Sequence, residues 1–401
     1  MATILSNKSG LRVLISGSIL NLLLGILYVW SVFVRPVSEI YGWDIESVKL
    51  TSSFMLSFFV VGILIGGKLQ LKAGTQKIVL LGGLMLSGGM LLTAILPENY
   101  APFMYITYGI IGGFGVGAAY NAIITASQKW FPKNRGLATG ISVCAFGFAT
   151  VIFAPLIETL IKIEQIGLRG TFLILAGIFL LFVLILFRFI RLPDIDAMAT
   201  SSDSAAFTKK QYTTSEAIKT KEFYLITLSL MFATATFFIL NPSFKILALE
   251  RGIDDHIATL IVMLTGVANA LGRLGTPLLS DKIGREKTAI INIYATALCA
   301  LFLCFANGFL FIFAIAVIAY CFGGCPGLYP VMVADYFGIK NVGSNYGAVM
   351  IGFAVSALTF PIVIGLINNI SVKFIVLSIL AAIGAILIII LLKSHKKGEI
   401  K

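Results

Sequence analysis

Twelve long runs of apolar residues divide the sequence, and they constrain its fold more than any other feature. The hydrocarbon core of a bilayer is about 30 Å thick, so a helix needs roughly 20 apolar residues to cross it. Only 12% of the residues are charged and 58% are hydrophobic, whereas soluble domains carry roughly 25% charged residues. This composition excludes a water-soluble globule and predicts an all-α integral membrane protein with twelve transmembrane helices. The predicted spans lie at about residues 11–34, 47–69, 77–96, 101–127, 136–160, 170–190, 221–243, 256–280, 288–306, 308–334, 343–368 and 372–392.

The distribution of basic residues predicts how the chain is oriented. The net charge is +12, and 22 of the 30 Lys and Arg residues fall in the tails and in the loops on the side of the tails. Lys and Arg are enriched in cytoplasmic loops of membrane proteins. We therefore expect a multi-pass protein of the plasma (inner) membrane with both termini in the cytoplasm. Because the excess charge has this explanation, no nucleic-acid partner is expected.

A polar stretch at residues 192–220 separates six predicted spans from the other six. The motif Lys72-Ala-Gly74 after the second span recurs as Lys282-Ile-Gly284 after the eighth, 210 residues later. Parallel repeats of six spans occur in secondary transporters, with the substrate site near the midplane. The predicted domains are an N-terminal six-helix bundle (1–191), a cytoplasmic central loop (192–220) and a C-terminal six-helix bundle with a short cytoplasmic tail (221–401).

The segment Gly275-Thr-Pro-Leu-Leu-Ser-Asp-Lys-Ile-Gly-Arg285 resembles the cytoplasmic loop motif of the major facilitator superfamily. Its counterpart after the second span keeps the same frame but has Leu71 where an Asp is usual. The resemblance implies the major facilitator fold, with two six-helix halves. The loop-motif residues that it implies are Gly275, Asp281, Lys282, Gly284 and Arg285.

Three segments resemble, more specifically, the oxalate:formate antiporter and monocarboxylate transporter family. They are Gly25–Phe33 in the first span, Lys129–Gly140 after the fourth and Ala334–Gly347 after the tenth. In that family an arginine in the eighth span and a lysine in the eleventh pair with carboxylates of the substrate. Arg273 matches the arginine position, whereas the lysine position falls on Phe353. One cation and one apolar aromatic residue suit a monocarboxylate better than oxalate.

Arg273 is also notable from its position alone. It lies inside the eighth predicted span, where no Asp or Glu of the sequence is comparably deep. A charge in hydrocarbon costs at least about 2.5–3.5 kcal/mol, so it usually faces a cavity or a partner. A guanidinium can hold a substrate carboxylate through two parallel hydrogen bonds. The alternative is that Arg273, seven residues before Ser280, extends toward the cytoplasmic interface and has a structural role.

Four more side chains are candidates for the substrate site. Tyr28, Tyr120 and Tyr329 lie within apolar spans and carry hydroxyl groups that can donate to a carboxylate, although the residue type alone favours packing in the core or at the lipid interface. Asn269 lies one turn before Arg273 and could orient it, or could make an interhelical hydrogen bond. With Arg273 and Phe353, these residues form the predicted substrate-binding set.

The function predicted from these features is secondary active transport. We expect a carrier for a small organic anion, preferably a monocarboxylate, that works by alternating access as an antiporter or a proton symporter. The alternative is a major facilitator carrier for another solute, such as a drug or metabolite exporter. No enzyme activity is expected, since the sequence has no P-loop or His-Glu-x-x-His motif. We expect no cofactor and no metal site, with a monomer in the bilayer.

Overall fold

The computed structural model describes residues 8–193 and 210–399, and these residues form helices without a single strand. The elements of the first half are α2 (Lys8–Leu24), η1 (Gly25–Tyr28), α3 (Trp30–Tyr41), α4 (Ile45–Ala73), α5 (Thr75–Ala94), η2 (Glu98–Phe103), η3 (Tyr105–Gly112), α6 (Gly113–Trp130), α7 (Arg135–Lys162), α8 (Gly167–Leu186) and η4 (Phe187–Phe189). Those of the second half are α11 (Thr214–Ala217), α12 (Lys221–Leu240), η5 (Asn241–Ser243), α13 (Phe244–Leu249), α14 (Asp255–Ile283), α15 (Arg285–Phe302), α16 (Gly308–Phe337), α17 (Val342–Gly365) and α18 (Ile370–Glu399).

The helices confirm the predicted all-α membrane architecture. Eleven helices among the described residues are long and apolar enough to cross a membrane. The remaining predicted span corresponds to α15, which carries three charged residues, Arg285, Glu286 and Lys287, at its start. Most of the predicted central loop, residues 194–209, lies outside the described residues.

Contacts group the chain into two compact units. Unit 1 comprises residues 1–133, 145–208 and 341–347, and unit 2 comprises residues 134–144, 209–340 and 348–401. Each unit therefore consists mostly of one half of the chain together with a short segment from the other half, at the start of α7 or of α17.

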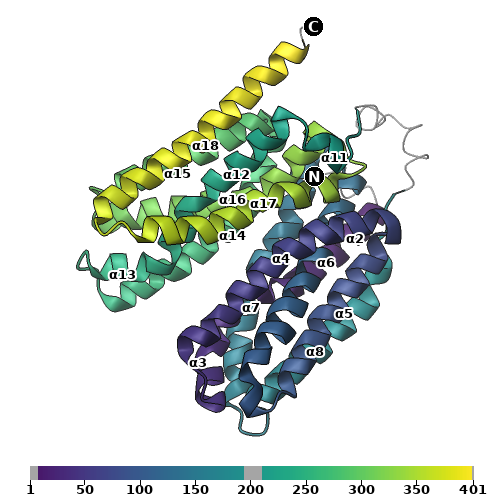
Figure 1. The fold of residues 1–401 in the computed structure, drawn as a ribbon, viewed down its shortest axis with the longest axis vertical. Coiled ribbons are helices and arrows are strands. Elements are labelled where there is room, and N and C mark those ends of the chain that lie inside the picture. The colour runs from purple at the N-terminus through teal and green to yellow at the C-terminus, as the bar shows by residue number, and fades with distance from the viewer. Residues whose placement is uncertain (1–7, 194–209, 400–401) are drawn as a thin grey trace. The chain divides into compact units, whose positions relative to one another are not determined.

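Within unit 1, α6 packs against both α4 and α5, and α5 packs against α8 (Figure 1). Glycine allows the α4–α6 approach, because a Cβ atom at Gly117 would overlap the carbonyl oxygen of Phe59. Small residues let transmembrane backbones come this close. Within unit 2, α14 packs against α16, and α18 packs against α12 and α15. A Cβ atom at Gly272 would likewise overlap the carbonyl oxygen of Tyr320.

The first span of each half is interrupted rather than continuous. A 3-10 turn at Gly25–Tyr28 separates α2 from α3, and another at Asn241–Ser243 separates α12 from α13. Proline follows the first residue of the second turn and favours a new helical start. The first and the seventh spans are thus interrupted in the same way, which makes the interruption a structural repeat between the two halves.

Candidate functional site

Arg273 is buried inside unit 2, with 3% of its surface exposed. Its Nε donates a hydrogen bond of 2.9 Å to Oδ1 of Asn269, one turn earlier in α14. This contact fixes the plane of the guanidinium relative to its helix. The structure thus brings together two of the predicted substrate-binding residues.

Two other helices approach α14 at Arg273. From α7, the thiol of Cys144 contacts the carbonyl oxygen of Ala270 at 3.4 Å. A Cβ atom at Gly140 would lie 3.3 Å from the Arg273 carbonyl oxygen, and one at Gly327 of α16 would lie 2.8 Å from it. Arg273 therefore belongs to a tightly packed junction of α7, α14 and α16 within unit 2, built on glycine.

Tyr329 uses its hydroxyl group in an interhelical contact. The Tyr329 Oη and the Ser229 Oγ lie 2.8 Å apart, and Tyr329 is 1% exposed. This hydrogen bond joins α16 to α12. Tyr329 therefore has a packing role in the structure, with its hydroxyl group bound to Ser229.

Phe353 lies in an aromatic cluster formed by α12, α16 and α17. Its ring centre is 5.0 Å from that of Phe238, in an edge-to-face arrangement, and 6.2 Å from that of Phe322. Phe322 in turn stacks on Phe237 at 4.0 Å. Edge-to-face and offset stacks are the favoured aromatic geometries. The position that the family resemblance assigns to a lysine is thus part of a buried aromatic cluster.

Tyr28 and Tyr120 both contact Phe146 in unit 1. The ring centre of Phe146 lies 5.6 Å from that of Tyr28 and 4.9 Å from that of Tyr120. Phe59 adds a contact of 5.4 Å to Tyr120. The six predicted substrate-binding residues therefore fall into two groups, with Tyr28 and Tyr120 in unit 1 and the other four in unit 2.

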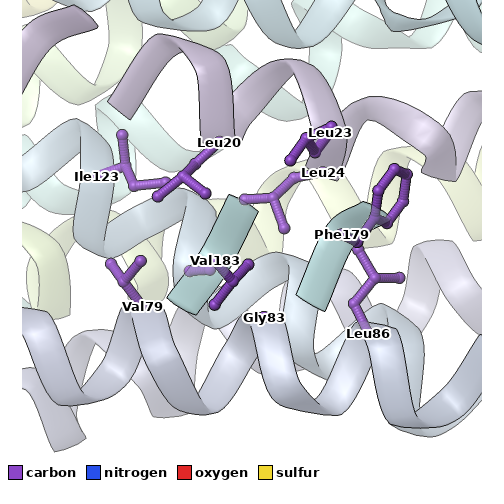
Figure 2. A pocket seen from close by; sticks show the side chains of 10 residues that line it. Leu20, Leu23, Leu24, Val79, Gly83, Leu86, Ile123, Phe179 and Val183 are labelled. Atoms are coloured by element: carbon purple, nitrogen blue, oxygen red, sulfur yellow. The ribbon is translucent and has the colours of Figure 1, made fainter. Parts of the chain in front are cut away.

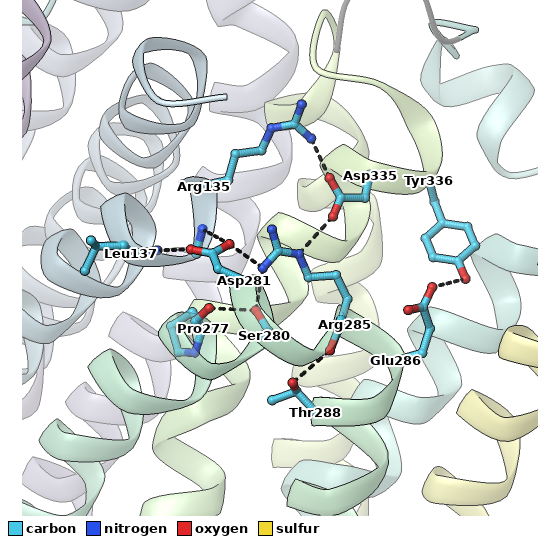
Figure 3. Close-up of polar contacts among 12 residues, drawn as sticks. Arg135, Leu137, Pro277, Ser280, Asp281, Arg285, Glu286, Thr288, Asp335 and Tyr336 are labelled. Atoms are coloured by element: carbon cyan, nitrogen blue, oxygen red, sulfur yellow. Dashed lines mark hydrogen bonds and ion pairs between the residues drawn. The ribbon is translucent and has the colours of Figure 1, made fainter. Parts of the chain in front are cut away.

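The loop motif at the end of α14 organises an ionic cluster in unit 2 (Figure 3). The carboxylate of Asp281 accepts hydrogen bonds from the backbone N–H groups of Gly136 (3.1 Å) and Leu137 (2.8 Å) at the start of α7. The first N–H groups of a helix lack partners inside the helix, and a carboxylate there also interacts favourably with the helix dipole. Asp281 therefore anchors the N-terminus of α7 to α14.

Arg285 extends the cluster to α16. Its guanidinium pairs with Asp281 at 2.6 Å and with Asp335 at 2.9 Å, and Asp335 also pairs with Arg135. Burial lowers the pKa of Arg285, but Asp335 and Asp281 raise it more, so the net shift is upward. Two arginines and two aspartates make the cluster electrically balanced.

Sequence reasoning singled out Asp281 and Arg285 but not their partners Arg135 and Asp335. Both partners lie inside the segments Lys129–Gly140 and Ala334–Gly347 that carry the family resemblance. The opposite charges of Arg135, at the start of the fifth span, and Asp335, at the end of the tenth, are consistent with an ion pair. The sequence alone does not show that they meet, because 200 residues separate them.

The corresponding contact in unit 1 is made by hydrogen bonds from a side-chain amide. Leu71, which replaces the usual Asp, is 52% exposed. The start of α17 is held instead by Asn121, whose Nδ2 donates to the carbonyl oxygens of Gly343 and Ile63, both at 2.8 Å. Gly67 allows this approach, since a Cβ atom there would overlap the Gly343 carbonyl oxygen.

A small apolar cavity lies between α2, α5, α6 and α8 in unit 1 (Figure 2). Leu20, Leu24, Val79, Phe179 and Val183 are among the side chains that line it. Since a buried carboxylate needs charged or hydrogen-bonding partners, this cavity is unsuited to an anion. In the part of the chain that the structure describes, no three His, Cys, Asp or Glu residues are grouped to hold a metal ion.

Comparisons with known proteins agree with this architecture. The chain is 27% identical over 350 residues to the uncharacterized MFS-type transporter YhjX of Escherichia coli, covering 86% of this chain and 85% of that protein. It is 27% identical over 330 residues to the oxalate:formate antiporter of Oxalobacter formigenes, covering 80% and 76%. It is also 26% identical over 329 residues to monocarboxylate transporter 12 of Xenopus laevis, covering 75% and 70%.

Solved structures show the same fold. The proton:xylose symporter XylE superposes with a TM-score of 0.70 at 16% sequence identity, over 94% of this chain and 95% of that one. The human organic anion transporter MFSD10 superposes with a TM-score of 0.68, also at 16% identity, over 95% and 99%. The model of the Major Facilitator Superfamily matches residues 13–238 and 226–401. The chain therefore belongs to the Major Facilitator Superfamily, a family of membrane transporters.

Proposed function

We propose that this transporter carries a small organic anion, preferably a monocarboxylate, by alternating access, as an antiporter or a proton symporter. The observation that carries the proposal is the buried Arg273, whose guanidinium is oriented by Asn269. An oriented guanidinium recognises a carboxylate by geometry as well as by charge. The names of two relatives, an oxalate:formate antiporter and a monocarboxylate transporter, support the same class of substrate.

Phe353 is the basis for preferring one carboxylate group over two. The helix α17 that carries it contains no Lys or Arg, so it supplies no second cation. Its aromatic neighbours Phe238 and Phe322 offer contact to an apolar part of a substrate. A dianion such as oxalate would have to bury its second charge there without a partner, which is costly.

The test is uptake and counterflow in proteoliposomes with formate, lactate, pyruvate, oxalate and neutral solutes. We expect exchange of the monocarboxylates to exceed that of oxalate. Transport restricted to neutral or cationic solutes would contradict the proposal and favour a carrier for a drug or another metabolite. A pH-sensitive dye in the lumen separates the two coupling modes, because proton symport acidifies the lumen during uptake and anion exchange does not.

A charge introduced at residue 353 tests the selectivity argument. The variant Phe353→Lys supplies the second cation, so oxalate should compete better against formate, by about tenfold or more. The variant Phe353→Leu, which keeps the site apolar, is the matched control and should leave the ratio of the two substrates nearly unchanged. An unchanged ratio in the lysine variant, in protein that still transports formate, would show that residue 353 does not face the substrate.

A further inference from the structure

The two loops that carry the repeated motif differ in their balance of charge. Lys72 and Lys77 are exposed at the α4–α5 turn of unit 1, and Lys282 and Lys287 occupy the equivalent positions, 210 residues later, in unit 2. Around the second pair the chain has carboxylates, including Asp281 and Glu286. From Ser47 to Pro97 the sequence contains no Asp or Glu. The positive charge of the first loop is therefore uncompensated along the chain.

A second basic segment lies against the first. The Nε2 of Gln76 in α5 donates to the carbonyl oxygen of Arg188 at 2.8 Å, so the segment after α8 packs on the start of α5. Trp130 holds the same segment by donating its Nε1 to the carbonyl oxygen of Arg191 at 2.6 Å. The side chains of both arginines remain exposed. Backbone contacts thus fix this segment, and its two arginines stay exposed, with the Arg191 Nε donating to the Arg188 carbonyl oxygen at 3.2 Å.

These exposed residues at one end of unit 1 form what we call the basic cluster: Lys68, Lys72, Lys77, Arg188 and Arg191. Apolar side chains are exposed among them, since Leu69 is 39%, Leu71 52% and Phe189 45% exposed. Lys and Arg near the ends of transmembrane helices extend their charges to the interface while their aliphatic stems contact apolar surface. Charges and apolar groups in this arrangement match the two parts of a phospholipid.

We propose that the basic cluster binds the headgroup of an anionic phospholipid from the leaflet at this end of the protein, which the predicted orientation makes the cytoplasmic leaflet. Basic pockets between transmembrane helices recognise such headgroups, and each Lys or Arg near an anionic surface contributes about 1 kcal/mol. The headgroup phosphate contacts the lysines and arginines, and the acyl chains contact Leu71 and Phe189. Topology alone requires basic residues in a cytoplasmic loop, but it does not require the absence of carboxylates that separates this loop from its repeat in unit 2.

Leu71 has a specific part in this proposal. At the equivalent position in unit 2, Asp281 pairs with Arg285 and accepts hydrogen bonds from backbone N–H groups, so the charge of this arginine is balanced within the protein. An aspartate at residue 71 would instead place a negative charge beside Lys72 and Lys68. The replacement of Asp by Leu therefore leaves these lysines available to an anionic lipid.

The experiment compares two matched double variants of the full chain, K72Q/K77Q and K282Q/K287Q, which remove the same charge from equivalent positions. Each protein is purified in a neutral detergent and titrated with dioleoyl phosphatidylglycerol or dioleoyl phosphatidylcholine. Bound lipid is counted by native mass spectrometry, and the thermal midpoint is measured in parallel. For the unmodified chain we expect tighter binding and a higher midpoint with phosphatidylglycerol.

The expected result is a loss of about tenfold or more in phosphatidylglycerol affinity for K72Q/K77Q, with little change for K282Q/K287Q. Leu71→Asp should weaken binding of this lipid as well. The charge-conserving variant K72R/K77R should retain it, which separates loss of the site from failure to fold. Equal losses in both double variants, retention in both, or no difference between the two lipids for the unmodified chain would each overturn the proposal.

Discussion

At the scale of single residues, the environment of a charged side chain could not be inferred from its position in the sequence. Arg251 lies in the loop between the predicted spans 221–243 and 256–280, and its position in the sequence indicates no specific role. Its guanidinium nevertheless donates to the carbonyl oxygens of Leu303 (3.0 Å), Leu247 (3.1 Å) and Ala306 (3.3 Å), and lies 4.4 Å from the ring centre of Phe311. Arg251 thereby satisfies carbonyl groups beyond the end of α15, which lack partners within a helix.

The corresponding prediction concerns stability. Arg251→Gln should lower the free energy of unfolding by about 1–3 kcal/mol, because it removes charge-assisted hydrogen bonds and a cation–π contact. Arg35→Gln is the control, since Arg35 pairs only with Glu39 in the contacts described and its side chain is 86% exposed. An exposed pair of this kind contributes at most about 1 kcal/mol. Equal effects of the two variants on thermal unfolding in detergent would contradict the assigned role of Arg251.

Tyr329 shows the same limit of sequence reasoning. Its hydroxyl group was a candidate for substrate contact because the residue lies in an apolar span. The structure gives that hydroxyl a partner, Ser229, that is 100 residues away in the chain. Local sequence identifies which polar groups are buried, but the partner of a buried group depends on tertiary packing.

At the scale of elements, the helices were predictable because their lengths are dictated by the bilayer. Predicted spans such as 47–69 and 136–160 correspond to α4 (Ile45–Ala73) and α7 (Arg135–Lys162). The interruption at Gly25–Tyr28 was missed because apolar composition continues through it, and the predicted span 221–243 ends at Asn241–Ser243 without α13 beyond it. The grouping of residues 134–144 with unit 2 was also missed, since it depends on contacts such as those between α7 and Asp281.

The ionic cluster at the start of α7 is expected to stabilise the packing of α7, α14 and α16. Asp335→Asn should destabilise the protein, because it leaves Arg135 and Arg285 close together with less compensating charge. The double variant D335N/R135Q removes one charge of each sign and should recover part of the loss. A double-mutant cycle measures the coupling, for which we expect about 0.5–3 kcal/mol. Additive effects of the two substitutions on thermal unfolding would show that the pair contributes no coupling.

At the scale of the whole molecule, the two halves share a fold but differ in how they use charge. Unit 2 balances two arginines and two aspartates around the start of α7. Unit 1 holds the start of α17 with the amide of Asn121 and leaves Lys68, Lys72 and Lys77 exposed. In the sequence, this difference is visible only as Leu71 in place of the usual Asp. Which contacts hold each unit instead is visible only in the structure.

The most direct test of the proposed function is counterflow of labelled formate in proteoliposomes loaded with unlabelled formate. Counterflow reports exchange through the substrate site without an imposed ion gradient. Three proteins are compared: the unmodified chain, Arg273→Gln, and Arg12→Gln, which makes the same change at an exposed residue near the start of α2. The thermal midpoint of each protein controls for folding.

We predict that Arg273→Gln reduces counterflow by about a hundredfold or more, since loss of a charged hydrogen-bonding partner costs about 3 kcal/mol. Arg12→Gln should transport at the rate of the unmodified chain. If the Arg273→Gln protein is folded and exchanges formate at an undiminished rate, Arg273 does not bind the transported anion and the proposed site is wrong.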